Sequence, residues 1–289
     1  MKVYLSIDIG GTKTAVAVYK EDGNEIFYTK FSTEAEKGFR FLLNEIKRIT
    51  KNFLADKELV AGCIACPGPL DVPNGKIVFI ATMGWKNIPI VKEFEKAFGV
   101  KFYLLNDCTS GAYGCYIENN CPKNILYVSI STGIGGGLIL NNQLYEGNGQ
   151  AAEVGHMRVN GIGRKCPCGR TDCLELYASG SGISQLYYER TNERLTTPQI
   201  AQAAMHGNKI AIELFNQAGN YLLDVLQQIE TLLDVDLIVF GGGLIQSQSL
   251  FLPKVIKELK TKCVLANNDG KQVIKGAYYY LMKRLKEDK

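Results

Sequence analysis

The feature that most restricts the fold of this chain is a strand, a glycine-rich turn and a returning strand that occur twice. In both copies the strands are apolar and rich in β-branched residues, as buried strands are. The first copy comprises residues 3–9, 10–13 and 14–20, and the second comprises residues 125–131, 132–137 and 138–140. Because strands follow the glycines, neither copy has the pattern of a P-loop or a dinucleotide-binding turn, in which a helix follows. The repetition predicts an α/β fold built by duplication.

The segments between and after these copies have alternating strand and helix patterns. Apolar residues at helical spacing, such as Phe39, Leu42 and Ile46, predict an amphipathic helix over 36–51. The other predicted elements are strands at 25–31, 59–65, 101–105 and 236–240, and helices at 90–98, 208–233 and 276–286. The first half therefore follows the order β-β-β-α-β-α-β, and the second half begins again at Asn124.

Composition excludes several classes of protein. The 289 residues are 46% hydrophobic and 21% charged, as in an ordinary soluble globular protein. No apolar run approaches the roughly 18 residues of a membrane span. The net charge of +4 is small and dispersed, which argues against nucleic-acid binding. The odd number of cysteines, nine, and an N-terminus without signal-peptide features favour a reducing cytoplasm.

Both glycine-rich turns could bind phosphate. Glycine has no Cβ, so backbone amides can approach an anion closely. Two such turns, each with a threonine, could hold a polyphosphate from two sides, whereas each turn alone could be a tight hairpin. A third cluster, Gly241–Gly243, could lie against a ribose or another flat ligand, or could be a plain strand-to-helix turn. The candidate nucleotide-binding residues are Asp8, Gly10, Gly11, Thr12, Lys13, Thr132, Gly133, Gly242 and Gly243.

Two acidic residues end predicted strands. Asp8 ends an apolar strand, where burial without a partner is costly, so we expect it to face a cleft and a cation. Asp107 follows Asn106 at the end of another strand, and ligands of open α/β sheets bind at such ends. Asp107 could accept a hydroxyl proton while Asn106 orients hydroxyl groups. The alternative is that the pair only caps the following helix.

Three cysteines and one of the two histidines form a cluster of metal-ligand type. His156, Cys166, Cys168 and Cys173 fall within eighteen residues, flanked by Glu153 and Glu175. Three thiolates and an imidazole are the ligands of a tetrahedral zinc, and a site with four protein ligands leaves no position for water. The cluster therefore predicts a structural zinc. The alternatives are a disulfide, which needs an oxidising compartment, or buried free thiols.

Five motifs in order resemble those of the ROK family (repressors, open reading frames, kinases) of bacterial sugar kinases. Asp8-Ile-Gly-Gly-Thr-Lys13 and Ser131-Thr-Gly-Ile-Gly-Gly-Gly137 resemble its two phosphate motifs. Pro67-Gly68-Pro69-Leu70-Asp71 resembles the loop below the sugar, and Asn106-Asp107 falls where the catalytic aspartate lies. Glu153-Val-Gly-His156 with Cys166-x-Cys168-Gly-x-x-x-Cys173-x-Glu175 is similar to the zinc signature.

The resemblance implies an actin-like, ribonuclease H-like fold of two lobes, which we place at 1–108 with 276–289 and at 109–275. It also implies ATP-dependent phosphorylation of a hexose at the 6-hydroxyl, with Mg²⁺ and a structural zinc, by a homodimer. Asp107 is then the general base, and Asp8, Thr12 and Thr132 manage the phosphates with Mg²⁺. The implied sugar-binding residues are Gly68, Asn106, Asp107, Glu153, His156 and Glu175.

The chain departs from the family pattern at Ala152, at Asp172 and at Cys108-Thr109-Ser110. These departures concern the preferred sugar more than the activity. The phosphate and cysteine motifs resemble N-acetylmannosamine kinases, whereas the Pro-Gly-Pro-Leu-Asp loop and Trp85 resemble glucokinases, so both sugars stay open.

Three other functions compete with a kinase. Only seven residues precede Asp8, which leaves no room for the helix-turn-helix of a family repressor. A sugar-sensing protein without catalysis remains an alternative, although the presence of Asp107 argues against it. A zinc hydrolase or deaminase needs an open metal position, which the four protein ligands do not leave.

Overall fold

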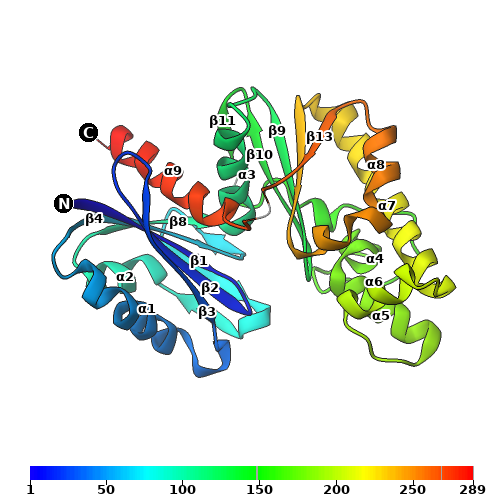
Figure 1. Ribbon diagram of the computed structural model, residues 1–289, viewed down its shortest axis with the longest axis horizontal. Helices are drawn as coiled ribbons and strands as arrows, with labels where there is room; N and C mark the ends of the chain where they lie inside the picture. Colours follow the sequence, from blue (N-terminus) through cyan, green and yellow to red (C-terminus); the bar gives the residue numbers. More distant parts are fainter. Residues whose placement is uncertain (148, 268, 289) are drawn as a thin grey trace. The chain divides into compact units, whose positions relative to one another are not determined.

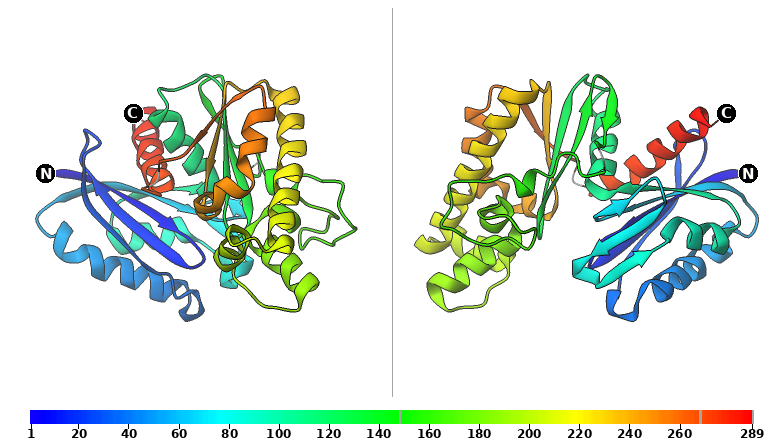
Figure 2. Two further views of the ribbon diagram at one scale, coloured as in Figure 1. Left: turned by 45° about the vertical axis from the view of Figure 1, so that its right-hand side comes forward. Right: turned by 180° about the vertical axis from the view of Figure 1, so that it is seen from behind.

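The computed structural model describes residues 1–147, 149–267 and 269–288. The chain divides into two compact units, coloured along the sequence in Figures 1 and 2. The first unit comprises Met1–Glu118, Glu146–Gln150 and Lys271–Lys289, and the second comprises Asn119–Tyr145 and Ala151–Gly270. The lobe limits expected from the sequence stay a prediction. The compact units differ from them most in residues 109–118, which here belong to the first unit.

The first unit contains a mixed five-stranded sheet in the order β3-β2-β1-β4-β8. The first three strands are antiparallel neighbours, whereas β1, β4 and β8 run parallel. The strands are β1 (Lys2–Ile9), β2 (Lys13–Tyr19), β3 (Glu25–Ser32), β4 (Glu58–Cys66) and β8 (Lys101–Asn106). Both ends of each of these strands lie within two residues of the predicted ends. Alternate apolar residues of β1 point into a core on one face of the sheet.

Helices cover both faces of this sheet (Figure 1). Leu42 and Ile46 of α1 and Phe94 of α2 pack with Leu5 and Ile7 of β1 on one face. On the other face, α9 contacts β1 and β4 and packs against α3. The helices are α1 (Phe39–Leu54), α2 (Ile90–Phe98), α3 (Asp107–Glu118) and α9 (Gln272–Glu287).

Helix α1 begins three residues later than predicted. Ala35–Lys37 form a short 3-10 turn (η1), and Gly38 then adopts a φ of 85° that interrupts the helical path. This left-handed φ suits glycine and few other residues. The predicted start at residue 36 was therefore wrong, because the apolar spacing does not report this break.

A small antiparallel sheet, which the sequence analysis did not predict, lies between β4 and α2. Its order is β5-β6-β7, with a 3-10 turn, η2 (Ala81–Met83), before β7. The strands are β5 (Leu70–Asp71), β6 (Lys76–Ile80) and β7 (Trp85–Ile88). Trp85 is buried, donates a hydrogen bond to the Ala35 carbonyl at 3.2 Å and meets Phe39 edge-on. These contacts attach the small sheet to the start of α1.

The second unit repeats the sheet of the first. Its order is β11-β10-β9-β12-β13, again with three antiparallel neighbours followed by two parallel ones. The strands are β9 (Ile125–Ile130), β10 (Ile134–Leu140), β11 (Gln143–Tyr145), β12 (Leu237–Gly241) and β13 (Lys262–Leu265). The same order with the same directions confirms the predicted duplication.

Helices of the second unit gather on one side of its sheet (Figure 1). Leu222 and Leu226 of α7 pack with Leu126, Val128 and other inward residues of β9. The helices are α4 (Glu175–Ala178), α5 (Gly180–Thr191), α6 (Thr197–Met205), α7 (Lys209–Leu233) and α8 (Leu252–Glu258), with 3-10 turns η3 (Val154–His156) and η4 (Gly243–Leu250). Only α7 was predicted among them.

The second glycine-rich turn is shorter than predicted. Ile134 already pairs with Ile130, and Gly135, Gly136 and Gly137 continue the ladder within β10. The turn therefore consists of Ser131, Thr132 and Gly133, and the prediction that it extends to Gly137 was wrong. The glycines of β10 have a packing role instead, because the segment around Ala152 lies directly against Gly136.

Candidate active site and metal centre

Three parallel strands of the first unit bring the predicted acidic residues to one edge of its sheet. In the register of β1 and β4, Asp8 lies opposite Ala65, and in that of β4 and β8, Cys66 lies opposite Asn106. Asp8 therefore stands near the carboxyl end of β1, and Asn106 and Asp107 stand at that of β8, with β4 between the two strands. Ligands of α/β sheets bind at this edge.

Asp8 and Asp107 both have raised pKa values. Burial is the main cause for Asp8, and the charge of Asp107 adds to it, so that its pKa rises to about 7 although Lys30 acts in the opposite direction. Burial also raises the pKa of Asp107, partly offset by the Cys108 amide, which donates to Asp107 Oδ1 at 2.8 Å. A carboxyl group such as Asp8, whose ionisation is disfavoured by burial and by a second carboxylate, would attract a cation.

Asn106 caps helix α3. Its Oδ1 accepts hydrogen bonds from the backbone amides of Cys108 at 2.9 Å and Thr109 at 3.2 Å. The capping alternative from the sequence analysis is thus correct for the oxygen of Asn106. The cap leaves the amide nitrogen for other partners, and this nitrogen lies close to Gly68, where an added Cβ would be 3.8 Å from it.

The first glycine-rich turn is held in shape by Thr33, which the sequence analysis did not single out. The Gly10 amide donates to the Lys13 carbonyl at 3.0 Å, and the buried Thr33 hydroxyl donates to the Gly10 carbonyl at 2.7 Å. The Thr33 amide donates to the carbonyl of Thr12 at 2.9 Å. Gly11, Thr12 and Lys13 themselves are exposed, as residues that receive a ligand must be.

The turn at Thr132 in the second unit is fixed by the start of helix α5. The amide and hydroxyl of Ser181 both donate to the Thr132 carbonyl, at 3.0 and 2.7 Å. Glu175 stands beside the turn, and its Oε2 accepts the Ile134 amide at 3.0 Å. A Cβ at Gly133 would lie 2.3 Å from that carboxylate oxygen, so a larger residue there would displace the Glu175 side chain.

The third glycine cluster lies against the second turn. Gly242 has a φ of 88°, and an added Cβ would lie 2.4 Å from the Ile130 carbonyl, so its backbone packs directly on the end of β9. A Cβ at Gly243 would meet the Ser131 hydroxyl at 3.5 Å. The structure thus gathers Thr132, Gly133, Gly242 and Gly243 in one place, as a nucleotide site would require.

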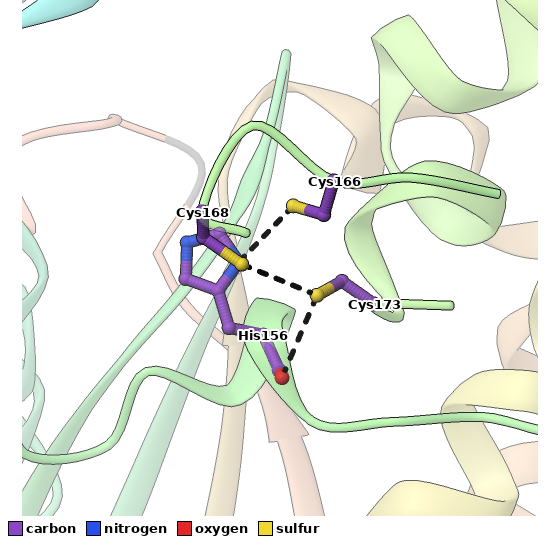
Figure 3. A group of neighbouring side chains, drawn as sticks. All are labelled: His156, Cys166, Cys168 and Cys173. Carbon is purple, nitrogen blue, oxygen red and sulfur yellow. Dashed lines mark hydrogen bonds between the residues drawn. The ribbon is translucent and has the colours of Figure 1, made fainter. Parts of the chain in front are cut away.

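The four predicted metal ligands converge (Figure 3). The imidazole nitrogens of His156 and the sulfurs of Cys166, Cys168 and Cys173 offer one ligand atom each, and these atoms all lie within 4.8 Å of one another. The Cys168 and Cys173 sulfurs are 3.6 Å apart, and Cys166 Sγ is 3.8 Å from His156 Nδ1. Such separations suit the four corners around a zinc with bonds of about 2.0–2.3 Å.

The disulfide alternative for these cysteines was wrong, because in the described part of the chain all nine cysteines are free thiols. Burial raises the pKa of Cys173 to about 12, so a cation is needed to hold it as a thiolate near neutral pH. The donor set and its spacing therefore fit a metal ion with four protein ligands.

The segment that carries Glu153 and His156 lies flat on strand β10. An added Cβ at Gly136 would be 2.5 Å from the Ala152 carbonyl, and one at Gly155 would be 2.1 Å from the Ile134 carbonyl. Glu153 is exposed and His156 is partly buried. The glycines on both sides bring the two segments to backbone contact, which sets where these two side chains begin.

The sequence model of the ROK family matches residues 4–278. Among curated proteins, the glucokinase of Streptomyces coelicolor is 28% identical to this chain, over 92% of this chain and 90% of its own length. The N-acetylmannosamine kinase of Vibrio vulnificus is 29% identical over 84% of this chain and 83% of its own length. The xylose repressor of Bacillus subtilis is 31% identical over 78% of this chain and 62% of its own.

Solved structures of similar fold include a ROK hexokinase from Thermus thermophilus, with a TM-score of 0.83, 24% identity and coverage of 97% of this chain and 99% of that one. A ROK family glucokinase from Streptomyces griseus, in complex with glucose and AMPPNP, gives a TM-score of 0.81 at 24% identity, over 96% of this chain and 98% of that one. The fold is thus the two-lobe actin-like ATPase fold expected from the motifs. In the residues that the structure describes, no helix has the length and apolar character needed to cross a membrane.

Proposed function

The chain belongs to the ROK family, and we propose that it is an ATP-dependent hexose kinase that phosphorylates glucose or N-acetylmannosamine at the 6-hydroxyl. Kinases of these two sugars are among its relatives over most of both chains. The observation that carries the proposal is Asp107, a half-buried residue whose carboxyl pKa is raised, at the carboxyl end of β8 and beside Asp8. An acid in this state suits a general base better than an ordinary exposed carboxylate.

In the proposed reaction Asp107 accepts the proton of the sugar 6-hydroxyl as that oxygen attacks the γ-phosphorus of ATP. The new bond joins the sugar oxygen to phosphorus, the bond to the bridging oxygen breaks, and ADP leaves with the electron pair. The Cys108 amide, 2.8 Å from Asp107 Oδ1, fixes the orientation of the carboxyl group. Asn106 and Gly68, which adjoin each other, bind sugar hydroxyls, as do Glu153, His156 and Glu175.

The phosphates are assigned to the glycine-rich turns, because phosphoryl transfer depends mainly on positioning and charge neutralisation. In the first turn the exposed residues Gly11, Thr12 and Lys13 are assigned to the phosphates, and Gly10 shapes the turn through its amide, which donates to the Lys13 carbonyl. In the second turn Thr132 and Gly133 are assigned to them. Mg²⁺ supplies positive charge to the phosphates when bound. Asp8, whose pKa is raised to about 7 by burial and by the charge of Asp107, is the residue proposed to face it. Gly242 and Gly243 lie against the ribose.

Zinc is proposed as a structural ion on His156, Cys166, Cys168 and Cys173. With four protein ligands it has no open position and takes no part in the chemistry. Its role is to fix the loop that carries the cysteines to the turn that carries His156. Glu153 and Glu175 begin within two or three residues of these ligands, so the ion also restricts where they lie.

A sugar-responsive regulator is the second candidate, because a xylose repressor is 31% identical to this chain, more than the two kinases named above. A regulator of this kind would bind sugar without turning over ATP. A single experiment that measures ADP formation and sugar binding on the same preparation distinguishes the two functions.

The test is an ADP-coupled assay with Mg–ATP and a panel of aldohexoses and N-acetylhexosamines. We expect turnover with glucose or N-acetylmannosamine, and a loss of at least about 10³-fold in kcat for Asp107→Asn. Asp22→Asn is the matched control, since Asp22 is exposed in the β2–β3 hairpin, where it accepts the Asn24 amide. Unchanged turnover in Asp107→Asn would remove Asp107 as the base. Tight sugar binding without ADP formation by the unmodified protein would favour the regulator.

A further inference from the structure

Asp172 has an unusual position within the cysteine-rich loop. It is 4% exposed and adopts a φ of 59°, in the left-handed region that most side chains avoid. Aspartate is tolerated there because its short side chain can bond to nearby backbone groups. It immediately precedes Cys173, so its backbone conformation sets the direction in which that ligand leaves the chain.

The carboxylate of Asp172 gathers three donors on one oxygen. The backbone amides of Gly163 and Arg164 each donate to Oδ1 at 2.9 Å, and the Tyr177 hydroxyl donates a short hydrogen bond to the same atom. The backbone of Asp172 is also fully used. Its amide donates to the Arg164 carbonyl at 2.8 Å, and its carbonyl accepts the Val159 amide at 2.9 Å.

Tyr177 extends this arrangement to helix α4. Its hydroxyl oxygen accepts the Ile162 amide at 3.0 Å while its proton goes to Asp172. The ring is buried, and Gly161 leaves the space for it, since an added Cβ there would lie 2.3 Å from the hydroxyl oxygen. The segment 159–164, the cysteine-bearing residues 166–173 and helix α4 are therefore joined through one carboxylate and one phenol.

We propose that Asp172 is a positioning residue that, together with Tyr177, holds the cysteine-rich loop in the arrangement needed to bind the metal. Residue 164 precedes Cys166 by two positions, and Asp172 directly precedes Cys173. The clamp between them thus closes the loop at both ends of the three-cysteine segment. It does so with charge-assisted hydrogen bonds, which are stronger and more directional than neutral ones. The proposal rests on the zinc assignment made above.

Residues that hold metal ligands in place usually affect metal affinity. Groups that orient metal ligands without touching the metal change affinity by about 10–100-fold when they are removed. For Asp172→Gly we expect zinc affinity to fall by that factor. Glycine keeps the left-handed backbone without strain, so this variant removes the carboxylate and leaves the conformational preference satisfied. Tyr177→Phe removes one donor to Asp172 and the acceptor of Ile162, and should lose affinity in the same direction.

The experiment measures zinc transfer from the purified, fully loaded protein to a chromophoric chelator. A parallel titration with Co²⁺ follows the visible absorption that reports a tetrahedral thiolate site. Asp172→Asn is the conservative variant, because its amide oxygen can accept the same three donors and asparagine also tolerates the left-handed region. Lys165→Ala is the matched control within the loop. Lys165 is exposed, and its amine donates only to the Thr171 hydroxyl among the interactions described.

We expect Asp172→Gly and Tyr177→Phe to release zinc at least about tenfold faster and to show a weaker or shifted Co²⁺ absorption. Asp172→Asn should stay within a few-fold of the unmodified protein, and Lys165→Ala should be unchanged. Zinc retention by Asp172→Gly equal to that of the unmodified protein overturns the proposal. So does an equal loss in Lys165→Ala, which would mean that any change in the loop disturbs the site. Absence of zinc from the unmodified protein would instead refute the zinc assignment itself.

Discussion

Asp8 and Asp107 are acids that the fold keeps where a charged carboxylate is poorly solvated. Asp8 follows five residues of β1 that are fully or almost fully buried, and burial together with the charge of Asp107 raises its pKa to about 7. When it is ionised at neutral pH, such a group lowers the stability of the folded protein, unless a cation or another group binds beside it. At the scale of single residues this conflict is the physical sign of a functional site.

The conflict predicts that Asp8→Asn makes the Mg²⁺-free protein more stable at high pH. The folded-state pKa of about 7 exceeds the reference value of 3.8, so folding takes up a proton between these pH values. The contribution of Asp8 to stability is therefore fully present below about pH 4 and is lost as the pH rises through about 7. Asparagine has no such loss. We expect the variant to gain up to about 4 kcal/mol at pH 8, at about 1.4 kcal/mol per pKa unit, and little at pH 4.

Urea unfolding of both proteins at several pH values, without Mg²⁺ or nucleotide, measures this gain. The exposed Asp22→Asn serves again as the control and should follow the unmodified protein at every pH. A gain in Asp8→Asn that is the same at pH 4 and pH 8 would contradict the assigned pKa, because a packing effect does not depend on pH.

Sequence alone indicated which residue types end the strands, but not what they contact. The apolar runs before Asp8 and Asp107 predicted strands that end near these acids, and in the structure both acids lie at strand ends. The runs could not show that Asn106 caps α3 with its oxygen, or that Thr33 holds the first turn from 23 residues away. Those roles depend on contacts between segments, which composition and spacing do not report.

At the scale of elements, the glycines of the second motif have two different roles. Gly133 gives room to Glu175 in the turn, whereas Gly136 lies inside strand β10 and allows close approach of residues 152–154. Both glycines were expected in one turn, because a run of glycines looks alike in sequence whether it bends the chain or only lacks side chains. The pairing of β10 with β9 distinguishes the two.

This division predicts that Gly136→Ala destabilises the protein by about 1–3 kcal/mol, the usual range for overpacking. The new Cβ would lie 2.5 Å from the Ala152 carbonyl and 2.8 Å from Val154 Cγ2, so the segment leading to His156 must move. Thermal and urea unfolding give the magnitude. Gly243→Ala is the matched control for stability, since its Cβ would meet only Ser131 Oγ at an ordinary 3.5 Å. Equal stability of the two variants would show that the close approach at Gly136 is unimportant.

The elements that the sequence analysis missed are short or lack a periodic pattern. Strands β5 and β11 have two and three residues, too few for alternation to be recognised. Helix α5 contains glycines and serines in its first turns and is defined by the Ser179 cap and by packing against α4 and α7. Long, strongly periodic elements such as α1 and α7 were located correctly, with errors confined mainly to their ends.

At the scale of the whole molecule, the repeated sheet order shows what a duplicated fold preserves. Both units keep three antiparallel strands followed by two parallel ones, although their sequences have little in common. The two copies carry different chemistry at corresponding turns. The first holds Asp8 and its turn with Thr33, and the second holds Thr132 with the start of α5. The duplication was predictable from the repeat, whereas the order of strands within each sheet and these separate supports were not.

The metal cluster belongs entirely to the second unit, which predicts a local response to zinc removal. His156 lies on η3, and the three cysteines precede α4, so loss of the ion removes one of the links between these two segments. We expect hydrogen–deuterium exchange in residues 153–178 to increase at least about tenfold after chelation under reducing conditions, and to recover when zinc is restored. Strands β1 to β3 should exchange as before, since they carry none of the four metal ligands.

The variant His156→Ala should reproduce the effect without chelator. His206→Ala is the matched control, because this second histidine lies at the end of α6, where its ring bonds to the Gln202 carbonyl. Equal exchange with and without zinc would exclude a structural ion at this cluster. A comparable rise throughout β1 to β3 would mean that the metal supports the folding of the whole chain instead of the second unit alone.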